Sequence, residues 1–191
     1  MSVFGVRFHG RGGQGVVTAA ELLSVAAFLD EREAQAFPSF GSERMGAPVV
    51  SYCRIADTPI RTHEPVNTPH AVVNTDATLL HHVDVFSGLR DDGFVLLNSM
   101  YTPTELGLGS VVDRLGPGHV CNVAASDLAR EYVGKPLPNV CMLGALAALT
   151  DIVTEQSLVR AVRERFRPDI AERNIAALRA AFEPLSGVPG A

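Results

Sequence analysis

Short apolar segments alternate with helical patterns along the first two thirds of the chain. Patterns typical of strands occupy residues 3–8, 49–55, 71–73 and 94–97, with weaker ones at residues 111–112 and 119–123. Helical patterns occupy residues 16–28, 77–86 and 127–133. This alternation predicts an α/β fold, with a Rossmann-like, open and mainly parallel sheet that carries helices on both of its faces.

The last third of the chain predicts three consecutive helices, over residues 140–149, 155–166 and 169–182. Asn139 and Thr154 are expected to cap the first two of these helices, because short polar side chains accept hydrogen bonds from free N–H groups. The sheet is therefore expected to be followed by a helical C-terminal part. At 191 residues, the chain (1–191) is most simply a single domain.

The junction between the first strand and the first helix is the most informative segment, with the sequence His9-Gly10-Arg11-Gly12-Gly13-Gln14-Gly15. Because glycine has no Cβ, the backbone can adopt positive φ and a phosphate can approach the main-chain N–H groups. The helix N-terminus adds unpaired donors and a partial positive charge. The spacing matches the dinucleotide fingerprint, which alone is weak evidence. An anion-binding turn is predicted, and a turn that holds no ligand is the alternative.

A nicotinamide dinucleotide can be tested against the sequence, because its ribose is normally held by an acidic residue at the end of the second strand. Asp30 has a suitable separation from Gly10, but it lies in the polar stretch that closes the first helix. The next apolar segment, residues 34–40, contains Pro38 and is followed by no carboxylate. NAD is therefore disfavoured, whereas another phosphate-bearing ligand is left open.

A second candidate segment, residues 37–48, is dense in residues that bend the backbone and ends just before a strand. Loops of this kind carry function more often than stability. Its candidate binding residues are Ser39, Glu43 and Arg44. The planar guanidinium of Arg44 suits a phosphate or a carboxylate, and a local ion pair with Glu43 is the alternative.

Composition and charge exclude several classes of protein. A content of 47% hydrophobic and 19% charged residues describes a soluble globular protein. No apolar run approaches the roughly 20 residues that a membrane span needs. The net charge of −5 disfavours nucleic-acid binding, which relies on a basic surface. No export signal is visible, so the cytoplasm is the expected location.

The metal-binding residue types form no recognisable site. Cys53, Cys121 and Cys141 lie far apart and form no Cys-x-x-Cys pair, so no iron–sulfur or zinc site is expected from this chain alone. Each cysteine is expected to be a small buried hydrophobic residue. His81 and His82 are adjacent and would point in different directions from a helix. No metal ligand is predicted.

The glycine turn is one of five segments, at residues 7–15, 40–49, 54–61, 139–145 and 172–178, that follow one another along nearly the whole chain. Together they resemble the gamma subunit, or gamma domain, of the 2-oxoacid:ferredoxin oxidoreductases. The family often has proline where Ser42 stands, and its pyruvate-type members often have a second arginine where Met45 stands. The resemblance therefore leaves open whether the acid is pyruvate or a branched-chain, aryl or dicarboxylic 2-oxoacid.

The resemblance implies one subunit, inactive alone, of an enzyme that decarboxylates a 2-oxoacid on thiamine diphosphate and transfers the acyl group to coenzyme A. Electrons pass through iron–sulfur clusters to ferredoxin or another acceptor. Thiamine diphosphate, its Mg and the clusters are expected on alpha, beta and delta-type partner subunits.

This chain is then expected to supply no catalytic side chain and to help bind coenzyme A. The expected contacts are N–H groups of Gly12, Gly13, Gln14 and Gly15 and the charge of Arg11. A stand-alone nucleotide-dependent oxidoreductase and a purely structural subunit of the same complex are the alternatives.

Overall fold

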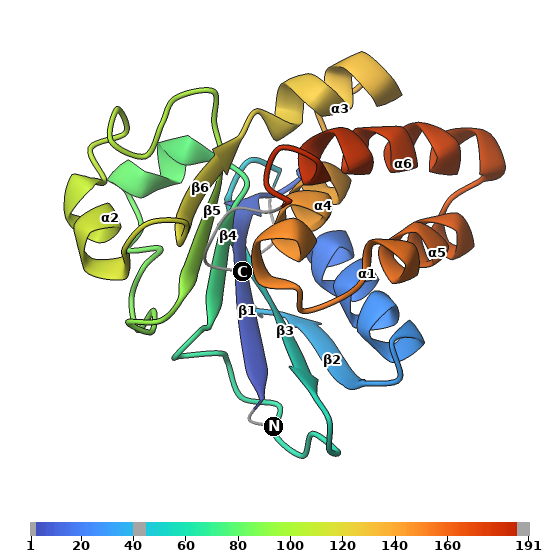
Figure 1. The fold of residues 1–191 in the computed structure, drawn as a ribbon, viewed down its shortest axis with the longest axis horizontal. Coiled ribbons are helices and arrows are strands. Elements are labelled where there is room, and N and C mark those ends of the chain that lie inside the picture. Colours follow the sequence, from blue (N-terminus) through green and yellow to red (C-terminus); the bar gives the residue numbers. More distant parts are fainter. Residues whose placement is uncertain (1–2, 40–44, 187–191) are drawn as a thin grey trace.

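The computed structural model describes residues 3–39 and 45–186, which are built around a six-stranded sheet of order β2-β3-β1-β4-β5-β6 (Figure 1). The strands are β1 (Phe4–Arg11), β2 (Glu33–Pro38), β3 (Pro48–Ala56), β4 (Ala71–Asn74), β5 (Phe94–Asn98) and β6 (Val120–Val123). β1, β4, β5 and β6 pair in parallel, whereas β3 runs antiparallel to both β1 and β2. The predicted α/β fold with an open, mainly parallel sheet is confirmed, and β3 is the exception.

Helices cover both faces of the sheet, but unequally (Figure 1). One face carries α1 (Val16–Leu29), α3 (Ala125–Val133), α4 (Asn139–Thr150), α5 (Glu155–Arg165) and α6 (Pro168–Phe182). The other face carries the short 3₁₀ helix η1 (Ala77–His81), α2 (Gly109–Leu115) and their loops. The larger core therefore lies between the sheet and the long helices, three of which form the predicted helical C-terminal part.

Helix α4 is the centre of the larger core. Every residue from Asn139 to Leu149 is buried, because α4 packs against α1, α3, α5 and α6 together. At Gly144 the backbone of α6 comes so close that an added Cβ would overlap the carbonyl oxygen of Leu178. Glycine at this position therefore allows the two helices to approach.

Residues 77–86 do not form the predicted helix, because the chain turns at Asp84, whose side chain accepts a hydrogen bond from the N–H of Phe86 at 3.3 Å. Only η1 forms, and the chain then continues through turns. The guanidinium of Arg7 on β1 donates to the carbonyl oxygens of Val85 at 3.0 Å, Ser87 at 2.6 Å and Val66 at 3.4 Å. These long-range hydrogen bonds pair both terminal nitrogens of the guanidinium and hold the turns around residues 85–87, while the Nε atom of Arg7 has no partner among the described residues.

Two other local predictions are wrong, and one is confirmed. Residues 111–112 lie in helix α2, where Leu108, Val111 and Leu115 share one face and pack on the smaller core. Asn139 is the first residue of α4 rather than its cap. Thr154 does cap α5, since its hydroxyl accepts a hydrogen bond from the N–H of Ser157 at 3.1 Å.

His9 is a buried, neutral histidine on the same face of β1 as Arg7. It is 5% exposed, and its Nε2 atom has no hydrogen-bond partner among the described residues. Burial, followed by the charge of Arg7, lowers the pKa of His9 from 6.5 to about 4. The folded protein therefore holds this ring in its uncharged form near neutral pH.

Gly144→Ala is expected to lower the free energy of unfolding by about 1–3 kcal/mol, because the added methyl group overlaps backbone rather than a movable side chain. Urea unfolding followed by circular dichroism measures the change. Gly109→Ala in α2 is the matched control, because its methyl group meets no atom within 4 Å. Equal losses in the two variants would contradict the close helix approach.

Acid is expected to destabilise the protein through His9. Below pH 6.5 the unfolded chain binds a proton at this residue, while the folded chain does not until the pH approaches 4. Stability is therefore lost as the pH falls through this window, by up to about 3 kcal/mol. His9→Gln should flatten the dependence of the unfolding free energy on pH between these values. A wild-type slope in His9→Gln would refute the assignment.

Candidate functional site

The glycine turn joins the end of β1 to the start of α1, as predicted. Gly13 and Gly15 have φ angles of 97° and 73°, a region that side chains other than glycine rarely adopt. Gly15 is the N-cap residue of α1. The glycines are thus required by the backbone path itself, which turns sharply enough to aim the first turn of α1 at the carboxyl edge of the sheet.

The free N–H donors of the turn differ from the predicted set. The N–H of Gly12 donates to the carbonyl of Ala47 at 2.9 Å, and that of Gln14 donates to the carbonyl of Arg11 at 3.0 Å. Within the described ranges, no acceptor is present for the N–H groups of the remaining turn residues and the first helical turn: Gly13, Gly15, Val16, Val17 and Thr18. The available donors are therefore the N–H groups of Gly13, Gly15 and the first turn of α1, and not those of Gly12 and Gln14.

The side chain of Gln14 holds the turn together. Its Oε1 atom accepts hydrogen bonds from the N–H of Arg11 at 2.8 Å and from the hydroxyl of Thr75 at 3.0 Å. Its Nε2 atom donates to the carboxylate of Asp76 at 3.0 Å. Gln14 is therefore a structural residue of the turn, and its amide is not free to meet a ligand.

Arg11 is also engaged within the chain. Its Nε atom lies 3.1 Å from Oδ2 of Asp76, and its two Nη atoms donate to the carbonyl of Gly46 and the hydroxyl of Thr78. Partial burial opposes ionisation of Asp76, but hydrogen bonds from Thr78 and Gln14 and the charge of Arg11 outweigh it and lower its pKa. The positive charge expected to face a ligand is thus largely balanced by Asp76.

Asp76 is a residue of this network that the sequence reasoning did not single out. It also caps η1, through a hydrogen bond from the N–H of Thr78 at 3.0 Å. The sequence did contain a signal for the place of Asp76. Asp76 follows β4 as the glycine turn follows β1, and residues that follow neighbouring parallel strands lie at the same edge of the sheet.

A second helix N-terminus meets the turn. Asn139, the first residue of α4, is 7% exposed, and an added Cβ on Gly15 would overlap its side-chain amide. In the described structure, neither α1 nor α4 has a side-chain cap or an acidic residue in its first turn. The positive ends of two helix dipoles therefore lie together, and neither first turn contains an acidic residue.

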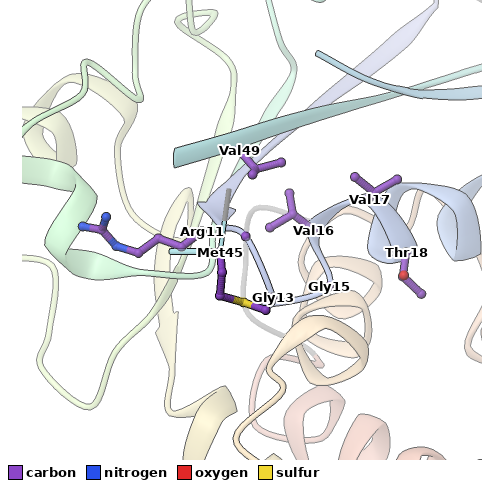
Figure 2. A pocket seen from close by; sticks show the side chains of 9 residues that line it. Arg11, Gly13, Gly15, Val16, Val17, Thr18, Met45 and Val49 are labelled. Atoms are coloured by element: carbon purple, nitrogen blue, oxygen red, sulfur yellow. The ribbon is translucent and has the colours of Figure 1, made fainter. Parts of the chain in front are cut away.

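A cavity of about 450 Å³ lies over this turn (Figure 2). Its floor is the glycine turn with the first turn of α1, and its apolar walls are Val17, Val49 and Met45. Figure 2 shows the side chain of Met45 reaching toward Gly13, while Arg11 points away from α1. The cavity therefore offers main-chain donors at one side and apolar contacts at the other.

Two of the remaining predicted residues, Gly10 and Ser39, do not line the cavity. Gly10 is buried within β1, where an added Cβ would overlap the hydroxyl of Thr75. Ser39 is exposed, and its N–H donates to the carbonyl of Val50 at 2.8 Å. Glu43 and Arg44 lie outside the described residues.

The two candidate segments do meet in part. Met45 forms a bridge to Gly12, and the N–H of Gly46 donates to the carbonyl of Gly12 at 3.1 Å. Sequence reasoning missed Met45, Val17 and Val49 as cavity residues because apolar side chains carry no chemical signature of a site.

Asp30, which the nicotinamide test singled out, has a structural role. Its carboxylate accepts hydrogen bonds from the N–H and the hydroxyl of Thr154, at the start of α5. Moreover, β2 pairs with β3 at the sheet edge and not with β1. The strand-end acid of a dinucleotide site therefore has no counterpart at this position.

The metal-binding residue types are dispersed. Over residues 3–39 and 45–186, no three histidine, cysteine or acidic side chains are grouped to hold a metal ion. Cys53 and Cys141 are buried, which raises the pKa of both thiols, and Cys121 is only half-buried. Among the same residues, no helix has the length and apolar character to cross a membrane.

Comparison with known proteins gives one consistent result. A family model described as pyruvate ferredoxin/flavodoxin oxidoreductase matches residues 5–184. The pyruvate synthase subunit PorC of Methanothermobacter marburgensis is 45% identical over 180 residues, which are 94% of this chain and 96% of that protein. The pyruvate/ketoisovalerate oxidoreductases common subunit gamma of Pyrococcus furiosus is 43% identical over 180 residues, 93% of this chain and 95% of that protein.

A solved structure gives the same answer. The pyruvate oxidoreductase subunit PORC from Thermotoga maritima matches with a TM-score of 0.82 and 33% identity, over 96% of this chain and 97% of that chain. The resemblance found in the sequence is thereby confirmed.

Proposed function

The chain belongs to the pyruvate ferredoxin/flavodoxin oxidoreductase family, and we propose that it is the gamma-type subunit of a multi-subunit, cytoplasmic 2-oxoacid oxidoreductase. The complex converts a 2-oxoacid, coenzyme A and an oxidised acceptor into acyl-CoA, carbon dioxide and the reduced acceptor. The role of this chain is to bind and position coenzyme A. Partner subunits of alpha, beta and delta type hold the iron–sulfur clusters and the Mg-bound thiamine diphosphate that supplies the decarboxylation chemistry.

One observation carries this proposal: several main-chain N–H groups that have no acceptor among the described residues lie where two helix N-termini meet. Coenzyme A carries a pyrophosphate and a ribose phosphate. Phosphate oxygens accept charge-assisted hydrogen bonds from such donors, and negative charge offsets the two helix dipoles. An anion is therefore the ligand that this arrangement favours, and the pyrophosphate is its natural occupant.

The cavity also suits the less polar parts of coenzyme A. Its volume of about 450 Å³ is within the usual range for small-molecule sites. Val17, Val49 and Met45 provide apolar surface beside the donors. We place the pyrophosphate at Gly13, Gly15 and the first turn of α1, with the remainder of the carrier along this wall and outward to a partner subunit.

The contribution of this chain is geometric. Its turn residues hold the carrier by main-chain groups, and no side chain here need act as nucleophile, acid or base. The hydrogen bonds among Arg11, Gln14 and Asp76 keep the turn in one conformation before the ligand arrives. A preorganised site replaces a random encounter of the thiol with the reacting acyl group by an oriented one.

Thr18→Asp tests the proposal without weakening the fold. Thr18 lines the cavity and lies in the first turn of α1, where an acidic side chain favours the helix but repels phosphate. In the assembled complex, the KM for coenzyme A is expected to rise roughly 10- to 100-fold, because like charges are brought together. The turnover number at saturating coenzyme A should change little.

Gln156→Glu is the matched control, since it adds the same charge to the exposed first turn of α5, outside the cavity. Its KM for coenzyme A is expected to stay at the wild-type value. If the Thr18→Asp complex assembles and keeps the wild-type KM, a purely structural role of the turn is favoured instead.

A further inference from the structure

Met45 combines exposure with a place in the cavity wall. It is 88% exposed, more than any other large apolar side chain that the structure describes. A thioether at the surface is open to oxidation, and methionine is the only cavity-lining residue type here that oxidants readily change. The chemistry of Met45 is not used by the carrier-binding role of the turn.

The backbone holds Met45 beside the glycine turn. Gly12 forms a β-bridge with Met45. The N–H of Gly12 donates to the carbonyl of Ala47, and the carbonyl of Gly12 accepts a hydrogen bond from the N–H of Gly46. Arg11 adds a bond from its Nη1 atom to the carbonyl of Gly46 at 3.1 Å. The position of the Met45 backbone beside the glycine turn therefore follows from this local pairing.

The sulfur lies over Gly13. Its Sδ atom is 2.7 Å from the position that a Cβ on Gly13 would occupy, and Figure 2 shows the side chain extended toward that residue. Gly13 has an N–H group without an acceptor among the described residues. An oxygen atom added to the sulfur would therefore enter the space beside a free donor.

We infer that Met45 is a site of reversible oxidation by peroxide, and that its sulfoxide closes this cavity to the phosphates of coenzyme A. The inference rests on the proposed function of the cavity. A sulfur lone pair attacks one peroxide oxygen, the O–O bond breaks, and the second oxygen leaves as water after proton transfer. The thioether loses two electrons and the peroxide gains them. A dithiol-dependent sulfoxide reductase reverses the change, releasing the oxygen as water and forming a disulfide.

Two effects make the sulfoxide inhibitory. Its oxygen is a strong acceptor and takes the N–H of Gly13 that a phosphate would otherwise use. The same change replaces an apolar wall by a polar group, because a sulfoxide is no longer a flexible hydrophobic contact. Both effects weaken the binding of coenzyme A, so oxidation of Met45 is expected to leave the chemical steps of the reaction unchanged.

The other methionines of the described chain provide internal controls. Met100 is 68% exposed just beyond β5 but does not line the cavity, and Met142 is fully buried in α4. Peroxide is expected to oxidise Met45 and Met100 and to spare Met142. Only the oxidation of Met45 should weaken the binding of coenzyme A.

The test measures coenzyme A binding to the purified, assembled complex by isothermal titration calorimetry, before and after hydrogen peroxide. Peptide mass spectrometry records the sulfoxide at each methionine. Complete oxidation of Met45 is expected to weaken binding about tenfold, as the loss of a charge-assisted hydrogen bond does. Met100→Leu should show the same loss as wild type. In Met45→Leu, the affinity for coenzyme A should be the same before and after peroxide. Treatment of the oxidised wild-type protein with sulfoxide reductase should restore its affinity for coenzyme A.

The outcomes separate this inference from the function on which it rests. Binding that survives complete oxidation of Met45, or an equal loss in Met45→Leu, overturns the inference alone. A lack of coenzyme A binding before oxidation overturns the proposed function and the inference together.

Discussion

The meeting of two helix N-termini at Gly15 is the constraint on which the site depends. Helix α4 is buried on every side, so its start is fixed by packing against α1, α3, α5 and α6. Its first residue, Asn139, then lies against the glycine that begins α1. Two uncapped positive helix ends in contact are electrostatically unfavourable, and an anion between or beside them relieves that cost. The packing of the core is thus the physical basis of the proposed phosphate site.

A hydrogen-bond network keeps this arrangement rigid. Gln14 ties the turn to Thr75 and Asp76, and Arg11 ties it to Asp76, Thr78 and Gly46. The charged side chains satisfy one another, so the groups left for a ligand are main-chain N–H groups. Such donors are held in place by secondary structure and need little reorganisation when a ligand binds. A carrier held in this way can be positioned for a reaction that other subunits perform.

The buried polar residues on β1 show how one strand serves both faces of the sheet. Val6 and Phe8 join the larger core, whereas Arg7 and His9 face the side covered by loops. Arg7 organises the chain around residues 83–87 through their carbonyl groups. The smaller face is therefore held by the polar contacts of Arg7 in addition to its own small apolar core, and it contains few helical residues.

Local features of the site could be read directly from the sequence. The change from strand to helix around the glycines, the positions of four parallel strands and the cap at Thr154 all follow from periodicity and residue type within a few neighbours. Only the tertiary structure decided which N–H groups of the glycine turn are available to a ligand, because the carbonyl of Ala47 accepts a hydrogen bond from the N–H of Gly12. It also decided that Asp76 balances Arg11 and that Arg7 holds the turns around residues 85–87. These outcomes depend on hydrogen bonds between residues more than 30 positions apart, which a local pattern does not encode.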